Sequence, residues 1–183
     1  MPYMGFVIPV YNTESRVLEE TVKDLRRQTL LPIYIVNDGS TRGDTLELLR
    51  RLESEGLIEV IHQENQGKIA ALRTGVREGN LIYAFIIDDD VSIRKNGEYD
   101  GKPLDDILVE EASRLSRVDS GVCIVYPVAA RNRGRSILTR IQHVEHLIPT
   151  YFARKFMGSG LYIGGTGSLW KTREFLEVTE LHT

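Results

Sequence analysis

Short apolar runs alternate with amphipathic segments through the first half of the chain. The apolar runs predict buried strands at residues 4–10, 33–37, 57–62 and 81–87. Between them, apolar residues at helical spacing predict helices at residues 14–28, 45–55 and 69–78. We expect Gly56 and Gly79 to end the second and third helices as C-terminal caps. This order predicts an α/β fold: a doubly wound, mostly parallel sheet with helices on both faces.

The second half of the chain is less regular. It predicts a helix at residues 104–117, a strand at 122–128, a helix at 137–155 and a short helix from Thr172. Residues 158–168 contain five glycines, and Trp170, just after them, fits either a core position or stacking on a sugar. Because no linker separates the two halves, we expect a single domain over residues 1–183.

The composition excludes several classes of protein. Among 183 residues, 23 Lys+Arg stand against 26 Asp+Glu, whereas a nucleic-acid-binding surface is usually strongly basic. No apolar stretch reaches the ~20 residues needed to span a bilayer, and residues 1–10 lack the features of a signal peptide. The single cysteine, Cys123, lies in an apolar run, which indicates a buried thiol. We therefore expect a cytoplasmic protein with no nucleic-acid partner.

Polar residues directly follow three of the predicted strands, at the edge of the sheet where doubly wound folds bind ligands. They are Tyr11-Asn12-Thr13, Asp38-Gly39-Ser40 and Asp88-Asp89-Asp90. Three adjacent carboxylates, here called the acidic triplet, repel one another unless a cation or hydrogen bonds compensate. Hard divalent cations take carboxylate, phosphate and water oxygens. The triplet therefore predicts a metal that bridges to a diphosphate, with a solvated acidic turn as the alternative.

The other polar motifs allow two interpretations each. Gly67-Lys68 opens the third predicted helix, where backbone N–H groups and a lysine suit an anion, but a solvated lysine is the alternative. Asp38-Gly39-Ser40 is equally typical of an ordinary strand-to-helix turn, and Asn12-Thr13 of a helix N-cap.

Taken together, the motifs occur in an order that resembles a known enzyme family. In chain order they are Val7-Ile8-Pro9-Val10-Tyr11-Asn12, Val36-Asn37-Asp38-Gly39-Ser40-Thr41, Asn65-Gln66-Gly67-Lys68 with Ala71-Leu72 and Gly75, and Asp88-Asp89-Asp90. They resemble the family 2 inverting glycosyltransferases of GT-A fold, which is Rossmann-like. The resemblance is close over residues 4–94 and looser to residues 164–171, which resemble the family's acceptor-side glycine loop. It implies a nucleotide-binding half at 1–94 and a partial acceptor-side half at 95–183, incomplete at the C-terminal side.

The resemblance also implies roles for individual residues. The implied nucleotide site consists of Pro9, Val10, Tyr11, Asn12, Glu14, Asp38, Gly39, Lys68, Asp88 and Asp89. Residues 9–11 and Asp38 would hold the base, usually uracil, while Glu14 would help to form its pocket. Lys68 would lie near the phosphates. Asp88 and Asp90 match the outer positions of the family's Asp-x-Asp motif, where Asp90 would bind Mg²⁺ or Mn²⁺ and Asp88 would contact the nucleotide and complete the metal site.

The implied reaction is metal-dependent transfer of a sugar from a nucleotide sugar, with a UDP sugar expected, to a saccharide or lipid-linked acceptor. The family's general base is an Asp that follows the glycine loop in a Glu-Asp element. Here Glu180 is the only carboxylate at that place, and Leu181 occupies the position of the Asp. We therefore expect the catalytic base beyond residue 183, with Glu180 as the candidate within the chain.

The absence of that Asp leaves a second function open. The chain could be a non-catalytic nucleotide-sugar-binding module or a truncated fragment that lacks the general base. A nucleotidyltransferase is less favoured, because residues 7–12 lack the glycine-rich, basic signature expected near its first strand. Association of a longer parent protein with the cytoplasmic face of a membrane also stays open.

Overall fold

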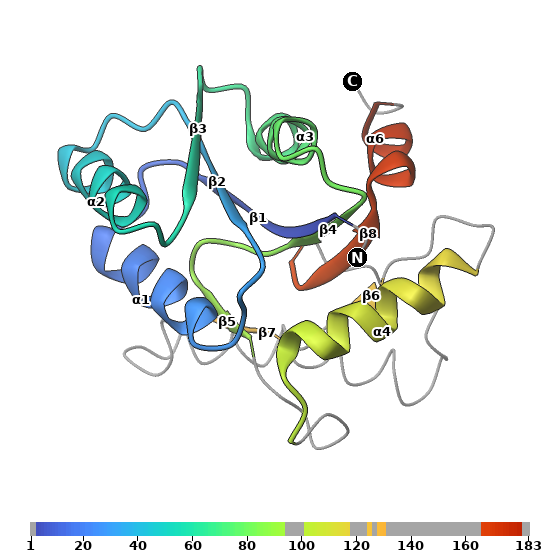
Figure 1. Ribbon diagram of the computed structural model, residues 1–183. Coiled ribbons are helices and arrows are strands. Elements are labelled where there is room, and N and C mark those ends of the chain that lie inside the picture. The colour runs from blue at the N-terminus through green and yellow to red at the C-terminus, as the bar shows by residue number, and fades with distance from the viewer. Residues whose placement is uncertain (1–2, 94–100, 118–123, 126–127, 131–165, 181–183) are drawn as a thin grey trace, which may run out of the picture.

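The computed structural model describes residues 3–93, 101–117, 124–125, 128–130 and 166–180. Its centre is a six-stranded sheet with the strand order β3-β2-β1-β4-β8-β6 (Figure 1). The parallel part consists of β1 (Met4–Val10), β2 (Ile33–Asp38), β3 (Glu59–Gln63) and β4 (Tyr83–Ile86). Antiparallel strands β8 (Ser168–Lys171) and β6 (Ile124–Val125) extend it beyond β4. The predicted mostly parallel α/β sheet is thus confirmed.

Helices cover both faces of this sheet, as predicted (Figure 1). One face carries α1 (Ser15–Arg26), α2 (Gly43–Ser54) and α4 (Leu104–Ser116), and the other carries α3 (Lys68–Glu78) and α6 (Thr172–Glu180). Successive strand side chains point to opposite faces. Accordingly, Phe6 and Ile8 of β1 belong to the core under α1, whereas Val7 belongs to the core under α3.

One predicted strand differs from the structure. The apolar run at residues 122–128, predicted as one strand, contains β6 and the start of β7 (Val128–Ala130), which pairs with β5 (Val91–Ile93) in a second sheet. Gly79 ends α3 as predicted but is right-handed, and Asn80 after it has the positive φ of 48°. A Cβ at Gly79 would lie 3.0 Å from the Tyr34 ring, so this glycine serves close packing.

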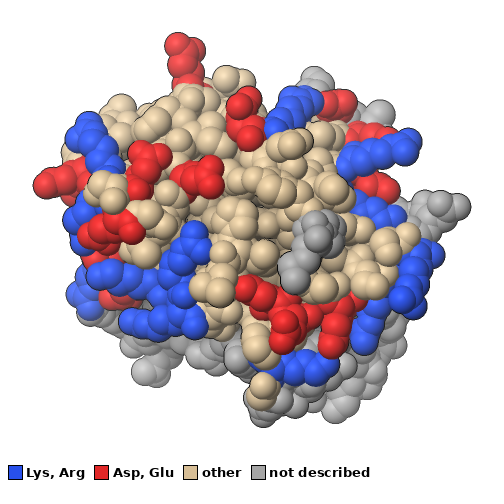
Figure 2. All heavy atoms as spheres, in the orientation of Figure 1, with Lys and Arg blue, Asp and Glu red and all other residues tan. Residues whose placement is uncertain are grey.

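Several predictions concern residues outside the described part of the chain: Cys123, the helix at 137–155 and most of the glycine-rich segment 158–168. In the part that the structure does describe, no helix has both the length and the apolar character needed to cross a membrane. Figure 2 shows acidic and basic side chains distributed around the margin of the visible face, in keeping with a net charge of −3.

Candidate functional site

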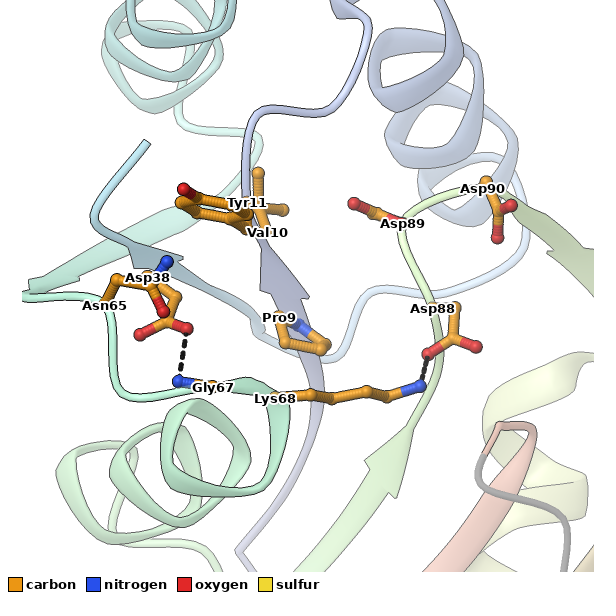
Figure 3. A pocket seen from close by; sticks show the side chains of 10 residues that line it. All are labelled: Pro9, Val10, Tyr11, Asp38, Asn65, Gly67, Lys68, Asp88, Asp89 and Asp90. Carbon is orange, nitrogen blue, oxygen red and sulfur yellow. Dashed lines mark hydrogen bonds and ion pairs between the residues drawn. The ribbon is translucent and has the colours of Figure 1, made fainter. Parts of the chain in front are cut away.

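A pocket of about 550 Å³ opens at the carboxyl end of the parallel strands (Figure 3). Its lining comes from the ends of β1 and β2, the β3–α3 loop and the segment after β4: Pro9, Val10, Tyr11, Asp38, Asn65, Gly67, Lys68, Asp88, Asp89 and Asp90. Parallel strands all end at this edge, so residues far apart in the sequence meet there. The volume lies in the range of about 300–1,000 Å³ that is usual for small-molecule pockets.

Asp38 fixes the wall of the pocket that the β3–α3 loop forms. The residue is 3% exposed. Its Oδ1 accepts hydrogen bonds from Gln63 Nε2 at 2.7 Å and from the backbone N–H of Gln66 at 2.9 Å. Its Oδ2 accepts a third from the N–H of Gly67 at 2.8 Å. Both carboxylate oxygens therefore hold this loop against the end of β2.

Gly39 lets the same loop approach the end of β2 closely. Its φ is +73°, a conformation that side chains with a Cβ rarely adopt. A Cβ on Gly39 would also lie 2.7 Å from the backbone nitrogen of Asn65, a pocket residue. Gly39 itself does not line the pocket, and its part is to permit this approach.

Asn12 and Glu14 do not belong to the pocket lining. Asn12 has a φ of 52°, and its Oδ1 accepts hydrogen bonds from the N–H groups of Thr41 at 2.7 Å and Arg42 at 2.9 Å. Its own N–H donates to Ser40 Oγ at 2.9 Å. Glu14 precedes α1, and its carbonyl accepts the first backbone bonds of that helix. Their nucleotide-binding roles stay predictions, and the contacts seen here connect backbone segments.

Asp88 is held by two contacts from different parts of the chain. Lys68, the first residue of α3, extends across the pocket, and its Nζ forms an ion pair with Asp88 Oδ1 (Figure 3). The N–H of Asp88 donates to Thr166 Oγ1 at 2.9 Å. Thr166 belongs to the glycine-rich segment 158–168, so the end of that segment lies beside the acidic triplet.

Asp89, the middle carboxylate of the acidic triplet, is partly buried. Burial raises the pKa of Asp89 above its ordinary value, and the negative charges of Asp90 and Asp88 act in the same direction. A hydrogen bond that Asp89 accepts from the hydroxyl of Thr13 lowers this pKa and only partly offsets the rise. A cation near the triplet would therefore relieve an electrostatic cost that the fold imposes.

The donor set of the pocket fits a divalent cation shared with a ligand. Within the described residues, no three or more His, Cys, Asp or Glu side chains are arranged to hold a metal by themselves. Mg²⁺ is usually bound by one or two carboxylates together with phosphate and water. Asp88 and Asp90, both in the pocket lining, offer carboxylates of that kind. They are the residues that would hold such an ion beside a diphosphate.

The structure brings together most, but not all, of the predicted site residues. Those that line the pocket are Pro9, Val10, Tyr11, Asp38, Lys68, Asp88, Asp89 and Asp90. Glu180, the candidate base, lies elsewhere and pairs with Arg77 and, at 3.7 Å, with Arg73 of α3. Arg77 is in the last turn of α3, whereas Lys68 begins that helix in the pocket. Glu180 is therefore placed toward the end of α3 that points away from the pocket.

Asn65 lines the pocket but was given no site role of its own in the sequence analysis. Gly67 lines it as well and was considered there only together with Lys68, as an anion site. Both lie in the loop after β3. The rule that ligands bind beyond the carboxyl ends of parallel strands applies equally to this strand and would have singled out Asn65.

The fold and pocket define an α/β protein with a ligand site at the carboxyl edge of a mostly parallel sheet. A model of the family Glycosyl transferase family 2 matches residues 6–97. The chain therefore belongs to glycosyl transferase family 2, as the motifs indicated.

Two curated relatives illustrate the similarity. The chain is 30% identical over 159 residues to "Uncharacterized glycosyltransferase EpsJ" of Bacillus subtilis (strain 168), a match that covers 80% of this chain and 43% of the relative. It is 32% identical over 97 residues to the poly-beta-1,6-N-acetyl-D-glucosamine synthase of Staphylococcus aureus (strain COL), covering 51% of this chain and 23% of that protein. The chain thus spans less than half the length of these relatives.

Solved structures with low sequence identity share the fold. S. aureus TarS 1-349 superposes with a TM-score of 0.62 at 14% identity, covering 97% of this chain and 49% of TarS 1-349. The complex of TarS 1-349 with UDP-GlcNAc superposes with a TM-score of 0.52 at 17% identity, covering 74% of this chain and 37% of the TarS chain. The mannosyltransferase PcManGT from Pyrobaculum calidifontis, in complex with GDP-Man and Mn²⁺, superposes with a TM-score of 0.50 at 21% identity. The match covers 68% of this chain and 35% of PcManGT. The predicted GT-A fold is thereby confirmed.

Proposed function

We propose that this chain is the donor-binding part of a metal-dependent, inverting glycosyltransferase. It binds a nucleotide sugar, and the sugar passes to a saccharide or lipid-linked acceptor. The observation that carries the proposal is the arrangement of the pocket, with Tyr11 and Asp38 on one side and Lys68 with the acidic triplet on the other (Figure 3). One side suits a nucleotide base, and the other suits a diphosphate with its cation.

The similar proteins support this choice of donor and cation. TarS 1-349 was crystallised with UDP-GlcNAc, and PcManGT with GDP-Man and Mn²⁺. One curated relative is named as a poly-beta-1,6-N-acetyl-D-glucosamine synthase, which supports a saccharide acceptor. We favour a UDP sugar as the donor and Mg²⁺ or Mn²⁺ as the cation.

Tyr11 and Asp38 are assigned to the base. The Tyr11 side chain is exposed in the pocket and offers a ring face, and stacking of a base on an aromatic ring is worth about 1–3 kcal/mol. A carboxylate has about four acceptor positions, and three of those on Asp38 are used by Gln63, Gln66 and Gly67. The remaining position can accept one hydrogen bond from a base N–H, such as that of uracil.

Lys68, Asp88 and Asp90 are assigned to the diphosphate end of the donor. The ammonium group of Lys68 can form charge-assisted hydrogen bonds to phosphate oxygens. Asp88 and Asp90 would hold the divalent cation, which when bound neutralises charge that develops on the leaving diphosphate. In the transfer, the acceptor hydroxyl gives its proton to a general base and its oxygen bonds to the anomeric carbon from the face opposite the diphosphate. The bond between that carbon and the phosphate oxygen breaks, and the nucleoside diphosphate leaves.

The test is calorimetric titration of the chain with UDP and with GDP, each in the presence of Mn²⁺ and again after EDTA. We expect UDP to bind with Mn²⁺ and to bind much more weakly after EDTA, because the diphosphate would then face uncompensated carboxylates. Tighter binding of GDP than of UDP would contradict the choice of base. No binding of either nucleotide with Mn²⁺ would contradict the donor site itself.

Asp90 provides the sharper test of the metal assignment. We expect Asp90→Ala to abolish the Mn²⁺-dependent part of UDP binding, because it removes one of the two assigned carboxylate ligands. A matched control is Asp106→Ala, since Asp106 is an exposed residue in the first turn of α4 and does not line the pocket. UDP affinity that is unchanged in Asp90→Ala would overturn the assignment of the metal to this residue.

A further inference from the structure

One of the two carboxylates assigned to the metal already pairs with a lysine of the pocket. The Lys68 ammonium forms its ion pair with Asp88 Oδ1, and the two side chains are 47% and 27% exposed. Lys68 begins α3, where the helix dipole disfavours a positive charge. Asp88 compensates this cost, and Lys68 in turn neutralises one charge of the acidic triplet.

We propose that Lys68 and the divalent cation compete for Asp88, and that donor binding transfers Lys68 from Asp88 to the diphosphate. This inference rests on the proposed function and adds to it a coupling between the two ligands. Without ligands, the Lys68 ammonium forms an ion pair with the Asp88 carboxylate and neutralises its charge. When a nucleoside diphosphate enters, its phosphate oxygens offer the ammonium group a second anionic partner, and Asp88 becomes available to the cation.

The charges in the pocket show why the exchange needs both ligands. With Lys68 on Asp88, one of the three carboxylates of the triplet is compensated by this contact. If Lys68 moved to a diphosphate without a metal, it would leave the triplet beside a polyanion with no cation on Asp88. If the metal bound Asp88 without a diphosphate, the displaced Lys68 would lose the partner that the structure shows. Each ligand therefore lowers the cost of binding the other, and this coupling is reciprocal.

The geometry of lysine allows such a movement. Its ammonium is a compact point charge on a flexible four-carbon stem, so the charge can change partner while the backbone of α3 stays in place. Figure 3 shows the Lys68 side chain crossing the pocket between the loop that carries Gly67 and the segment that carries Asp88. The exchange thus requires rotation of one side chain.

Lys68→Met tests the competition, because Met has a similar length and no charge. Binding of Mn²⁺ alone, followed by water-proton relaxation, should become about two- to fivefold tighter, the range set by the loss of a partly exposed ion pair. Binding of UDP with Mn²⁺, followed by calorimetry, should become about tenfold weaker or more, because a charged hydrogen bond to phosphate is lost. These opposite shifts in one variant distinguish a competitor from a simple phosphate ligand.

Lys102→Met is the matched control. Lys102 pairs with Glu110 at 2.8 Å, its side chain is 50% exposed, and it lies outside the pocket lining. The Lys102→Met variant should bind Mn²⁺ alone, and UDP with Mn²⁺, as tightly as the wild type. Unchanged or weaker Mn²⁺ binding by a Lys68→Met variant whose circular dichroism matches the wild type would overturn the competition.

Asp88→Asn tests the same exchange from the other side, with no metal present. In EDTA, this variant frees Lys68 for the diphosphate, so UDP should bind about two- to fivefold more tightly than to the wild type. A decrease or no change would contradict the exchange. If the wild type fails to bind UDP with Mn²⁺, the proposed function fails, whereas the Mn²⁺ titration of Lys68→Met still tests the competition separately.

Discussion

Asn12 connects the segments that follow β1 and β2, next to the pocket residue Tyr11. Its backbone is left-handed, with a φ of 52°, and its side-chain oxygen accepts hydrogen bonds from the N–H groups of Thr41 and Arg42. Asparagine adopts this conformation more readily than most residues other than glycine. One residue therefore supplies both the backbone shape and the contacts that place Tyr11 beside the end of β2.

Substitutions at Asn12 separate these two contributions. Asn12→Ala should lower the free energy of unfolding by about 2–3 kcal/mol, since it loses the hydrogen bonds, worth about 1 kcal/mol. It also keeps a left-handed residue that costs about 1–2 kcal/mol. Asn12→Gly should lose only about 1 kcal/mol, because glycine tolerates the positive φ. Urea unfolding of both variants gives the comparison, and equal losses would show that the backbone conformation contributes nothing.

At the scale of secondary structure, α3, which carries the pocket residue Lys68, packs closely against the sheet. Gly75, on the buried side of α3, faces β1 and β2. A Cβ on this residue would lie 2.5 Å from Val7 Cγ1 and 2.8 Å from Val36 Cγ2. The helix can lie this near only because residue 75 has no side chain, and the same helix begins with Lys68 in the pocket.

Gly75→Ala should therefore destabilise the protein, although alanine favours a helix by about 1 kcal/mol over glycine. Overpacking against two stiff valines costs about 1–3 kcal/mol, and the very short distances favour the upper end. We expect a net loss of about 1–2 kcal/mol in urea unfolding. Gly43→Ala, at the start of α2 with no heavy atom within 4 Å of its Cβ position, is the control and should show no loss. A Gly75→Ala variant as stable as the wild type would refute the close-packing argument.

The sequence predicted those elements that show a clear pattern of apolar residues within their own segment. The four parallel strands and their helices follow from apolar runs and helical spacing, and most of the pocket follows from where these strands end. Strands β5 and β8 were not predicted, because with three and four residues they are too short to show a periodic apolar pattern. Trp170 fitted two interpretations, and its ring packs edge-on to Phe175 of α6 at 5.5 Å, which favours the core position.

Sequence order was less informative about side-chain direction. Asn12, Glu14 and Gly39 lie within or beside the family motifs, yet none of them lines the pocket, and their contacts shape the backbone. A motif fixes a position along the chain, whereas the direction of a side chain depends on local backbone angles and on which neighbouring groups need a partner. These depend on the folded structure.

At the scale of the whole molecule, the two ends of α3 lie in different surroundings: one in the pocket and the other against α6. Lys68, at its first residue, belongs to the pocket, and Arg77, in its last turn, pairs with Glu180 of α6. Nine residues of helix correspond to about 14 Å along the axis. Phe175 of α6 also belongs to the core cluster under α3. The contact between Arg77 and Glu180 therefore attaches α6 to α3 at a distance from the assigned diphosphate end.

This arrangement predicts that Glu180 stabilises the α3–α6 contact and is not the catalytic base. Glu180→Gln should lower the free energy of unfolding by about 0.2–1 kcal/mol, the usual range for an exposed ion pair, and should leave UDP affinity with Mn²⁺ unchanged. Asp90→Ala, in contrast, should lose the Mn²⁺-dependent part of UDP binding. A general base must come within about 2.6–3.2 Å of the acceptor hydroxyl, which the pairing with α3 opposes. Turnover of a UDP sugar by this chain that Glu180→Gln abolished without weakening UDP binding would instead identify Glu180 as the base, because a residue that only attaches α6 to α3 would not affect the chemical step selectively.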